Sequence, residues 1–167
     1  KITFEMLERK SKEKQIKTKG LKIIKTNKCD IYVYETDPKK EFVDLIIGIP
    51  NKLEKLSDIC KEDKDIICKI NGQFFTFDNK NEFLGTHIDD GIIKRATSPN
   101  FIDFIYYKDG RTEIKFIKNE DLQYLKDITH WVAGTSYSLV INGEIKLLNI
   151  DKFSHSSQRH PRTLLGQ

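Results

Sequence analysis

The stretch IICKINGQFF, residues 66–75, joins an apolar run to a tight turn and two aromatic residues. The run at 66–70 is rich in β-branched side chains, which favours a strand that is buried on both faces. Asn71-Gly72 tolerates positive φ and turns the chain sharply, so we expect the strand to end there. Asn71 would then face a cleft from a rigid strand end. The alternative is an ordinary turn followed by two core phenylalanines.

Before this stretch, the pattern of apolar residues predicts three strands and one helix. The second strand alternates Ile31 and Val33 with tyrosines, as a sheet with two different faces requires. Asn51 can cap the helix with its side chain. A strand, a helix and the buried strand in this order suggest a βαβ-like unit at the head of a mixed sheet. The expected strands are residues 21–25, 30–35 and 42–49, and the expected helix is residues 52–61.

After residue 75, the pattern predicts hairpins and one short helix. The turn at 108–111 and the pair Asn142-Gly143 are hairpin signals, and Asn119 can cap the helix. We therefore expect an α+β domain with a mixed, largely antiparallel β-sheet and a few peripheral helices. One expected strand begins at Ile92. The others are residues 101–107, 112–117, 131–141 with an interruption at 134–136, and 144–148, and a further strand is expected to start at 163–166.

Length, composition and charge limit the class of protein. The 167 residues suit one domain, and a hydrophobic content of 38% is enough for its core. We interpret residues 1–20 as a basic lead-in, either a peripheral helix or a frayed segment, ahead of a domain at 21–167. The net charge of +4 forms no basic stripe with interleaved aromatics, so nucleic acid is not an expected partner. No apolar run is long enough for a membrane span, and no signal peptide is visible.

The cysteines and the known cofactor motifs give no positive signal. Cys29, Cys60 and Cys68 match no metal or redox spacing. We expect buried free thiols, either in a reducing compartment or in a protein that never needed disulfides. The sequence has no zinc, EF-hand, Walker or GxGxxG spacing, so we expect neither a dedicated metal nor a nucleotide cofactor.

Four motifs follow one another after residue 70. They are NGQFF at 71–75, GTHIDDG at 85–91, AGTSYSLVINGEI at 133–145 and HPRTLLG at 160–166. In this order they resemble the phosphodiester glycosidase family, whose pattern is NGGFF, G-x-x-x-x-DG, a strand-turn-strand with a glycine, and PRT-x-x-G. That family includes an enzyme that removes N-acetylglucosamine from a phosphodiester, together with bacterial and phage members. Gln73 replaces the second glycine of NGGFF here, so the backbone is less free at this position.

The resemblance implies hydrolysis of a sugar 1-phosphodiester. Phosphate leaves well, so a strong general acid matters less than in ordinary glycoside hydrolysis. The planar fork of Arg162 suits phosphate oxygens, and the carboxylate of Asp90 suits an oxocarbenium-like centre and the attacking water. From the residues alone, the alternative is that Arg162 forms an ion pair on the surface and that Asp90 is a solvated carboxylate in a turn. The resemblance assigns Asp90, Arg162 and His160 to catalysis, and Asn71, Gly72, Phe74, Gly134 and Thr163 to substrate binding.

Further side chains stay open as alternatives. Asp89 neighbours Asp90, but adjacent residues on a strand point to opposite faces, so both cannot serve equally. His87 and His155 are candidate acid–base residues, although such residues are more often ordinary surface histidines. The loop carboxylates Asp78, Asp89 and Asp90 keep a metal site open as an alternative to the expectation of no metal.

The resemblance covers only the first part of the family domain. Family members continue past PRT-x-x-G with a DGR-bearing strand and a DGGGS-like loop, and these do not follow PRTLLG here. Either a remainder lies outside residues 1–167, or the chain is a truncated relative that binds without catalysing. The alternative functions are a carbohydrate- or phosphate-binding module and an accessory domain of a phage particle. By resemblance, we expect a glycan phosphodiester as partner and an extracellular, cell-surface or virion-associated location, with the cytoplasm also open.

Overall fold

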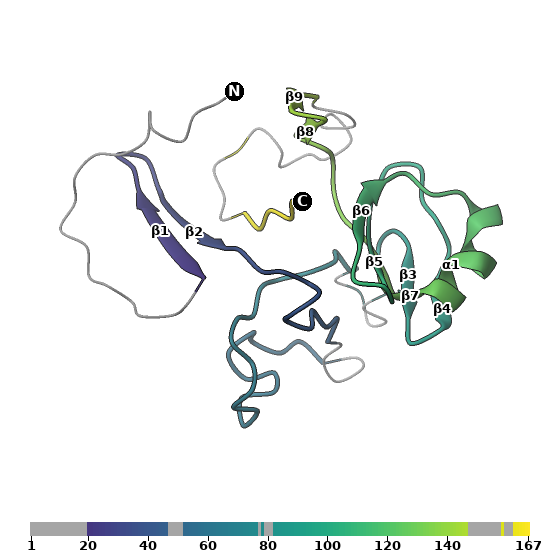
Figure 1. Ribbon diagram of the computed structural model, residues 1–167, viewed down its shortest axis with the longest axis horizontal. Coiled ribbons are helices and arrows are strands. Elements are labelled where there is room, and N and C mark those ends of the chain that lie inside the picture. The colour runs from purple at the N-terminus through teal and green to yellow at the C-terminus, as the bar shows by residue number, and fades with distance from the viewer. Residues whose placement is uncertain (1–19, 47–51, 77, 79–81, 147–157, 159–161) are drawn as a thin grey trace. The chain divides into compact units, whose positions relative to one another are not determined.

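The computed structural model describes residues 20–46, 52–76, 78, 82–146, 158 and 162–167 (Figure 1). The chain divides into two compact units, residues 1–41 and 42–167, which are described separately below. Together they contain mostly antiparallel strands and few helical residues, so the predicted α+β class with a largely antiparallel sheet is confirmed.

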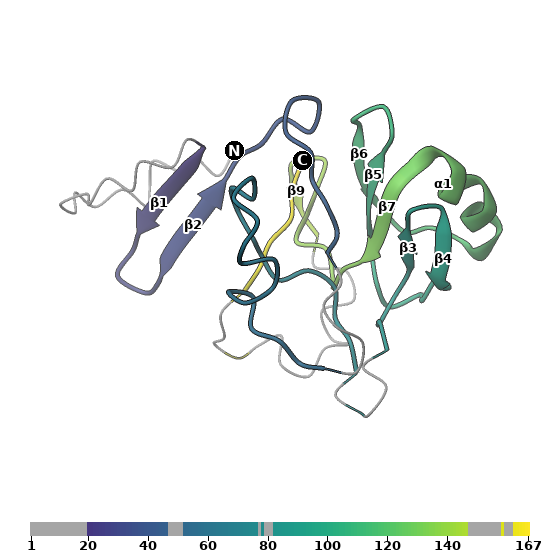
Figure 2. The ribbon, with the colours of Figure 1, turned by 90° about the horizontal axis from the view of Figure 1, so that it is seen from below.

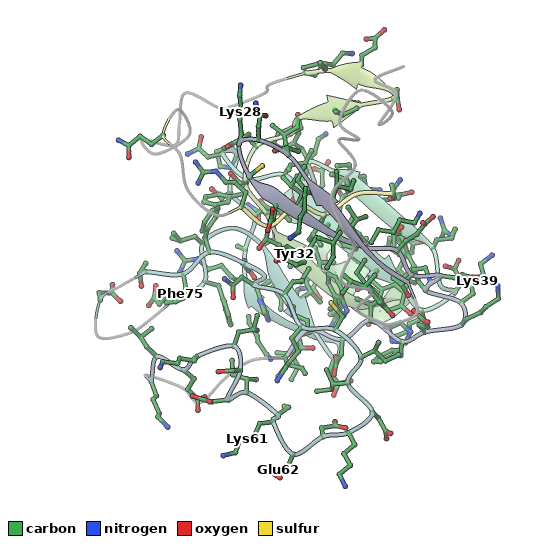
Figure 3. All side chains as sticks on the ribbon, turned by 90° about the vertical axis from the view of Figure 1, so that its left-hand side faces the viewer. Lys28, Tyr32, Lys39, Lys61, Glu62 and Phe75 are labelled. Carbon is green, nitrogen blue, oxygen red and sulfur yellow. The ribbon has the colours of Figure 1, made fainter. Side chains whose placement is uncertain are left out.

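The described part of the first unit, residues 20–41, contains one hairpin. Strand β1 (Leu21–Lys25) pairs antiparallel with β2 (Asp30–Tyr34). Both strands were predicted from the sequence, and their pairing is a finding of the structure. The Thr26 hydroxyl closes the turn, because it accepts hydrogen bonds from the backbone N–H groups of Lys28 and Cys29 at 3.1 and 3.0 Å. Lys28 and Tyr32 of this hairpin are exposed (Figure 3).

A five-stranded sheet is the main element of the second unit. Its order is β4-β3-β7-β5-β6, and every neighbouring pair is antiparallel. Strands β3 and β5 flank β7 and therefore run parallel to each other. The strands are β3 (His87–Asp89), β4 (Ile92–Arg95), β5 (Asp103–Tyr107), β6 (Thr112–Lys115) and β7 (Thr129–Gly134).

One face of this sheet is covered by a helix. A 3-10 turn, η2 (Asn119–Asp121), leads into α1 (Leu122–Ile128), as predicted from Asn119 onward (Figure 1). Leu122 and Leu125 of α1 belong to a buried cluster with Ile88, Ile105 and Val132, which are adjacent on the three inner strands. Burial of these aliphatic side chains joins the helix to the sheet.

An irregular segment covers the other face of the sheet. Trp131, Phe104 and Tyr106 form a second buried cluster there, with Val43 and Leu45 packed against it. The Trp131 indole N–H donates to the Val43 carbonyl at 2.7 Å. Residues 42–46 were predicted to begin a strand, and that prediction is wrong for them, because this carbonyl bonds to an indole and not to a neighbouring strand. Residues 47–49 of the same expected strand lie outside the described residues.

Three further predictions before and after the sheet are wrong. Residues 66–70 form no strand, and Ile67 and Ile70 are 58% and 51% exposed, because no strand pairs with this run. Residues 52–55 are irregular and residues 56–61 form turns in place of the predicted helix, and Cys60 has a left-handed φ of 48° that ends any helical hydrogen bonding there. The βαβ-like unit built on these two elements is therefore absent from the described residues. Residues 163–166 are exposed and form no strand.

The cysteines are free, but their predicted burial is wrong. Cys29, Cys60 and Cys68 are all exposed. Each lies in a turn or irregular segment that contributes no residue to the two buried clusters. Lys61 and Glu62, which follow Cys60, are exposed as well (Figure 3).

The predicted hairpin at Asn142-Gly143 is confirmed. Strand β8 (Val140–Ile141) pairs antiparallel with β9 (Glu144–Ile145). Asn142 and Gly143 have φ of 52° and 77°, the left-handed pair that a tight hairpin turn requires. The predicted interruption after Gly134 is also present, because β7 ends there.

Gly85 and Gly134 allow two backbones to approach closely at one end of β7. The Gly134 N–H donates to the Thr86 carbonyl at 2.7 Å. A Cβ at Gly134 would lie 2.7 Å from the Thr86 nitrogen and 2.8 Å from the Gly85 Cα. Both neighbours are backbone atoms, so a side chain fits only if a strand moves.

We expect Gly134→Ala to lower the free energy of unfolding by about 2 kcal/mol, because the added methyl group overlaps backbone atoms. Urea denaturation of both proteins measures the difference. Gly166→Ala is the matched control, since a Cβ at Gly166 meets nothing within 4 Å. Equal stability of the Gly134→Ala and Gly166→Ala variants would show that the close approach has no energetic importance.

Candidate functional site

Gln73 fixes the NGQFF segment against the chain that enters β3. Its side-chain nitrogen, Nε2, lies 2.9, 3.2 and 2.8 Å from the carbonyl oxygens of Leu84, Gly85 and Thr86. The backbone adds a hydrogen bond from the Leu84 N–H to the Phe74 carbonyl at 2.8 Å. Gln73, which stands where the pattern NGGFF has a glycine, therefore holds this segment in place through its side chain, although it makes the backbone less flexible.

The same amide orients His87. Because Nε2 of Gln73 faces carbonyl oxygens, which only accept, its Oε1 faces the imidazole, and His87 Nδ1 lies 2.7 Å away. Nδ1 must therefore carry the proton and donate it, which leaves Nε2 of the neutral ring as an acceptor. The Phe83 ring stacks on the imidazole at 3.9 Å and 9°.

His87 is buried, contrary to the interpretation of an ordinary surface histidine. Its exposed fraction is 1%. Burial lowers the pKa of His87 to about 4, the Lys94 ammonium lowers it further, and the Asp89 carboxylate opposes the shift. The ring is therefore uncharged at neutral pH, which agrees with the tautomer that Gln73 imposes.

A second buried polar pair, Thr86 and Asp103, lies on the opposite face of the sheet. Asp103 pairs with Gly134 across β5 and β7, and the Gly134 N–H donates to the Thr86 carbonyl. Thr86, Gly134 and Asp103 therefore lie side by side in this order, and the middle residue has no side chain. Burial raises the pKa of Asp103 to about 6, while the Thr86 hydroxyl and the Ile117 N–H, at 3.2 Å from Oδ2, oppose the shift. Thr86 is close enough to act on this carboxyl, although its hydroxyl does not reach good hydrogen-bond geometry.

Unsatisfied polar atoms are concentrated at this end of the sheet. Among the described residues, the buried side-chain atoms without a hydrogen-bond partner are Thr86 Oγ1, His87 Nε2 and Asp103 Oδ1. Buried polar groups in native proteins are nearly always paired, so such a group marks a place for a ligand, water or proton transfer. The cluster of Gln73, Thr86, His87 and Asp103 is named the polar cluster below.

Several residues expected to bind substrate lie beside the polar cluster. Asn71 and Gly72 directly precede Gln73 and are exposed, and Phe74 is 39% exposed with its ring 6.5 Å from that of Phe101. Gly134 is buried between Thr86 and Asp103 in the row described above. The structure therefore brings the NGQFF motif and Gly134 to one end of the sheet.

Asp90 lies at the opposite end of β3. It is exposed, and with φ of 48° it forms the left-handed turn with Gly91 that joins β3 to β4. Its N–H donates to the His130 carbonyl at the start of β7, at 3.3 Å. Asp89 differs from it, because it is half-buried within β3 and forms an ion pair with Lys94 at 2.6 Å. The length of β3 separates Asp90 from the polar cluster.

The HPRTLLG motif is described only in part. Arg162 and Thr163 are exposed, and Arg162 Nη2 donates to the Gln158 carbonyl at 2.9 Å. His160, like the alternative His155, lies outside the described residues. Thr163, Arg162 and His160 therefore stay sequence-based assignments.

Sequence reasoning did not place Gln73, Thr86 or Asp103 in the candidate site. Gln73 was noted only as a departure from NGGFF. Asp103 carried a usable signal, because it is the one ionisable carboxylate within the otherwise apolar predicted strand at 101–107.

The described residues hold no group of three or more His, Cys, Asp or Glu side chains arranged to bind a metal ion. Among the helices that the structure describes, none is long and apolar enough to cross a membrane.

Comparison with known proteins gives one match. The family model for phosphodiester glycosidases matches residues 64–167, which is more than half of the chain. The chain therefore belongs to the phosphodiester glycosidase family. No match was found among curated proteins or among solved structures.

The buried histidine and aspartate predict opposite pH effects on stability. His87 has a lowered pKa, so its neutral form contributes stability above about pH 6.5 that is lost as the pH falls towards 4. Asp103 has a raised pKa, so its neutral form contributes stability below about pH 4 that is lost as the pH rises through 6. Urea denaturation between pH 4 and 6.5 measures both.

Relative to the wild type, His87→Gln should become less destabilised as the pH falls, and Asp103→Asn should gain stability as the pH rises. Each variant serves as the control for the other, because both keep a polar side chain of similar size. Parallel pH profiles for the three proteins would contradict these assignments.

Proposed function

We propose that the chain hydrolyses a sugar 1-phosphodiester, on a surface or wall glycopolymer. The observation that carries the proposal is the family match over residues 64–167, which spans all four motifs. N-acetylglucosamine is the proposed sugar, because the resemblance in these motifs includes an enzyme that acts on it.

The proposed reaction is a displacement at the anomeric carbon. A water molecule forms the new C–O bond, the bond from that carbon to the phosphate oxygen breaks, and the phosphate monoester leaves with the electron pair. Asp90 takes the proton from water and stabilises the positive charge that develops on the sugar. Arg162 binds the phosphate oxygens with its planar fork, which neutralises charge on the leaving group.

The remaining proposed residues bind and orient the substrate. Asn71 offers an amide that hydrogen-bonds sugar hydroxyls or an acetamido group, and Gly72 and Phe74 shape its surroundings. Thr163 follows Arg162 in sequence and binds the phosphate with it. His160, two residues before Arg162, is assigned to catalysis at the same phosphate. Gln73 supports this arrangement, because its three carbonyl contacts hold the NGQFF segment in place.

One observation favours a second candidate, a carbohydrate- or phosphate-binding module of the same fold that does not catalyse. Asp90 and the Asn71–Gly134 region lie at opposite ends of β3, so the described residues do not place the carboxylate beside the proposed sugar contacts. A binding module, including an accessory domain of a phage particle, needs no such convergence.

Replacing Asp90 by Asn tests the catalytic role. Asn tolerates the left-handed φ of this turn, so the fold should persist. We expect turnover of a methyl phosphodiester of N-acetylglucosamine to fall at least about 100-fold, because the base is lost. Release of free sugar by the full-length protein is the measurement. Asp58→Asn, which removes another exposed turn carboxylate, is the control. Undiminished turnover in Asp90→Asn would contradict this role, and no turnover in the wild type would favour the binding module.

Replacing Arg162 by Lys tests the phosphate contact. Lysine keeps the charge but loses the fork, so we expect KM for the same phosphodiester to rise by about tenfold. Steady-state kinetics over a range of substrate concentrations measures this. Arg95→Lys, at an exposed arginine paired with Glu82 at 2.9 Å, should leave KM unchanged. An equal effect of both substitutions would assign the change to general surface charge.

A further inference from the structure

A cleft of about 360 Å³ opens where the β5–β6 turn meets the last turn of α1. It lies outside the polar cluster, and it contains none of the residues proposed above. Its walls combine Tyr107 and Arg111 from the hairpin with Tyr124 and Asp127 from α1. A volume of this size is at the lower end of small-molecule sites, which suits one or two small rings.

The polar side chains of this cleft are already held in place. The Arg111 guanidinium stacks on the Tyr107 ring at 4.5 Å, and its Nε donates to Asp109 at 2.7 Å. The Lys108 ammonium donates to the Asp127 carbonyl at 2.8 Å. Groups that are fixed before binding lose little conformational entropy when a ligand arrives.

Tyr124 is the contrasting member, because most of its surface faces solvent. It is 67% exposed, on the surface of α1. An exposed aromatic ring beside fixed donors and acceptors offers both an apolar face and a polar rim.

The charges of the cleft indicate the class of ligand. Lys108 and Arg111 are balanced by the carboxylates of Asp109 and Asp127, so the cleft attracts neither anions nor cations by net charge. A neutral pyranose has an apolar face of C–H groups and a rim of hydroxyls, which matches an aromatic ring with donors and acceptors around it. We propose that this cleft is a binding subsite for a neutral sugar ring, with Tyr124 as its aromatic platform.

The position of the cleft suits a polymeric substrate. Strands β3 and β5 run parallel, so the β3–β4 turn with Asp90 and the β5–β6 turn lie at the same end of the sheet (Figure 2). The end of α1 lies between them, since Lys126 O is 3.8 Å from a Cβ built on Gly91 and Asp127 lines the cleft. The assignment to a sugar of the same glycan rests on the proposed function. Under this assignment, the cleft binds the sugar residue next to the one that is hydrolysed at Asp90.

Binding is tested separately from turnover. The probe is the uncharged trimer of N-acetylglucosamine, added at up to about 10 mM to the full-length protein and followed by backbone amide NMR shifts. We expect the shifts to centre on the β5–β6 turn and on residues 124–128. Tyr124→Ala should weaken binding by about tenfold, because the stacking surface is lost. Arg111→Ala, which removes a donor at the other wall, should weaken it as well.

Tyr32→Ala is the matched control, since Tyr32 is 64% exposed on β2, outside the cleft, and its variant should bind as the wild type does. Wild-type shifts elsewhere, no binding at this concentration, or unchanged affinity in Tyr124→Ala would each overturn the subsite. Turnover of the methyl phosphodiester is measured on the same wild-type sample. Binding without turnover would remove the proposed hydrolysis and leave the subsite, whereas turnover without binding would do the reverse.

Discussion

The close contact of Gly85 and Gly134 is the constraint on which the second unit depends. Because neither residue has a side chain, the entry to β3 lies against the end of β7, and the Gly134 N–H reaches the Thr86 carbonyl. That contact fixes the position at which the chain enters β3. Because side chains alternate along a strand, it also fixes the face of the sheet on which Thr86 and His87 are each buried. Gln73 then bonds to the same short backbone segment, so the NGQFF motif is held by the glycine contact indirectly.

The two faces of the sheet treat their buried polar groups differently. On one face, an amide and a stacked phenyl ring hold His87 in a single neutral form. On the other, Asp103 has one oxygen bonded to the Ile117 N–H and the other without a partner among the described residues. A lone buried carboxylate is costly, so it is neutral over a wider pH range than a surface one. A histidine whose pKa is lowered by burial and an aspartate whose pKa is raised by burial are the kind of perturbed groups that cluster at functional sites.

The sequence was informative where local chemistry decides the structure. Asn142-Gly143 and the turn after Tyr107 need left-handed glycines, so short-range signals were enough to find both hairpins. The strand predictions for residues 66–70 and 42–46 were wrong, because an apolar run becomes a strand only if another strand is available to pair with it. For the candidate site, the motifs proposed Asn71 and Gly134 as substrate contacts, and these assignments stay predictions. The motifs could not show that Gln73 would bond to His87, because that contact joins residues whose approach depends on the whole sheet.

The central position of β7 has a consequence for how the chain is made. During synthesis, the hairpins β3–β4 and β5–β6 emerge first, and the strand that must pair between them emerges after both. Each hairpin alone is only marginally stable in water and has unpaired backbone groups along β3 or β5. The nascent chain therefore holds two open strand edges until residue 134 has left the ribosome, and during that interval it is most exposed to wrong pairing with other chains.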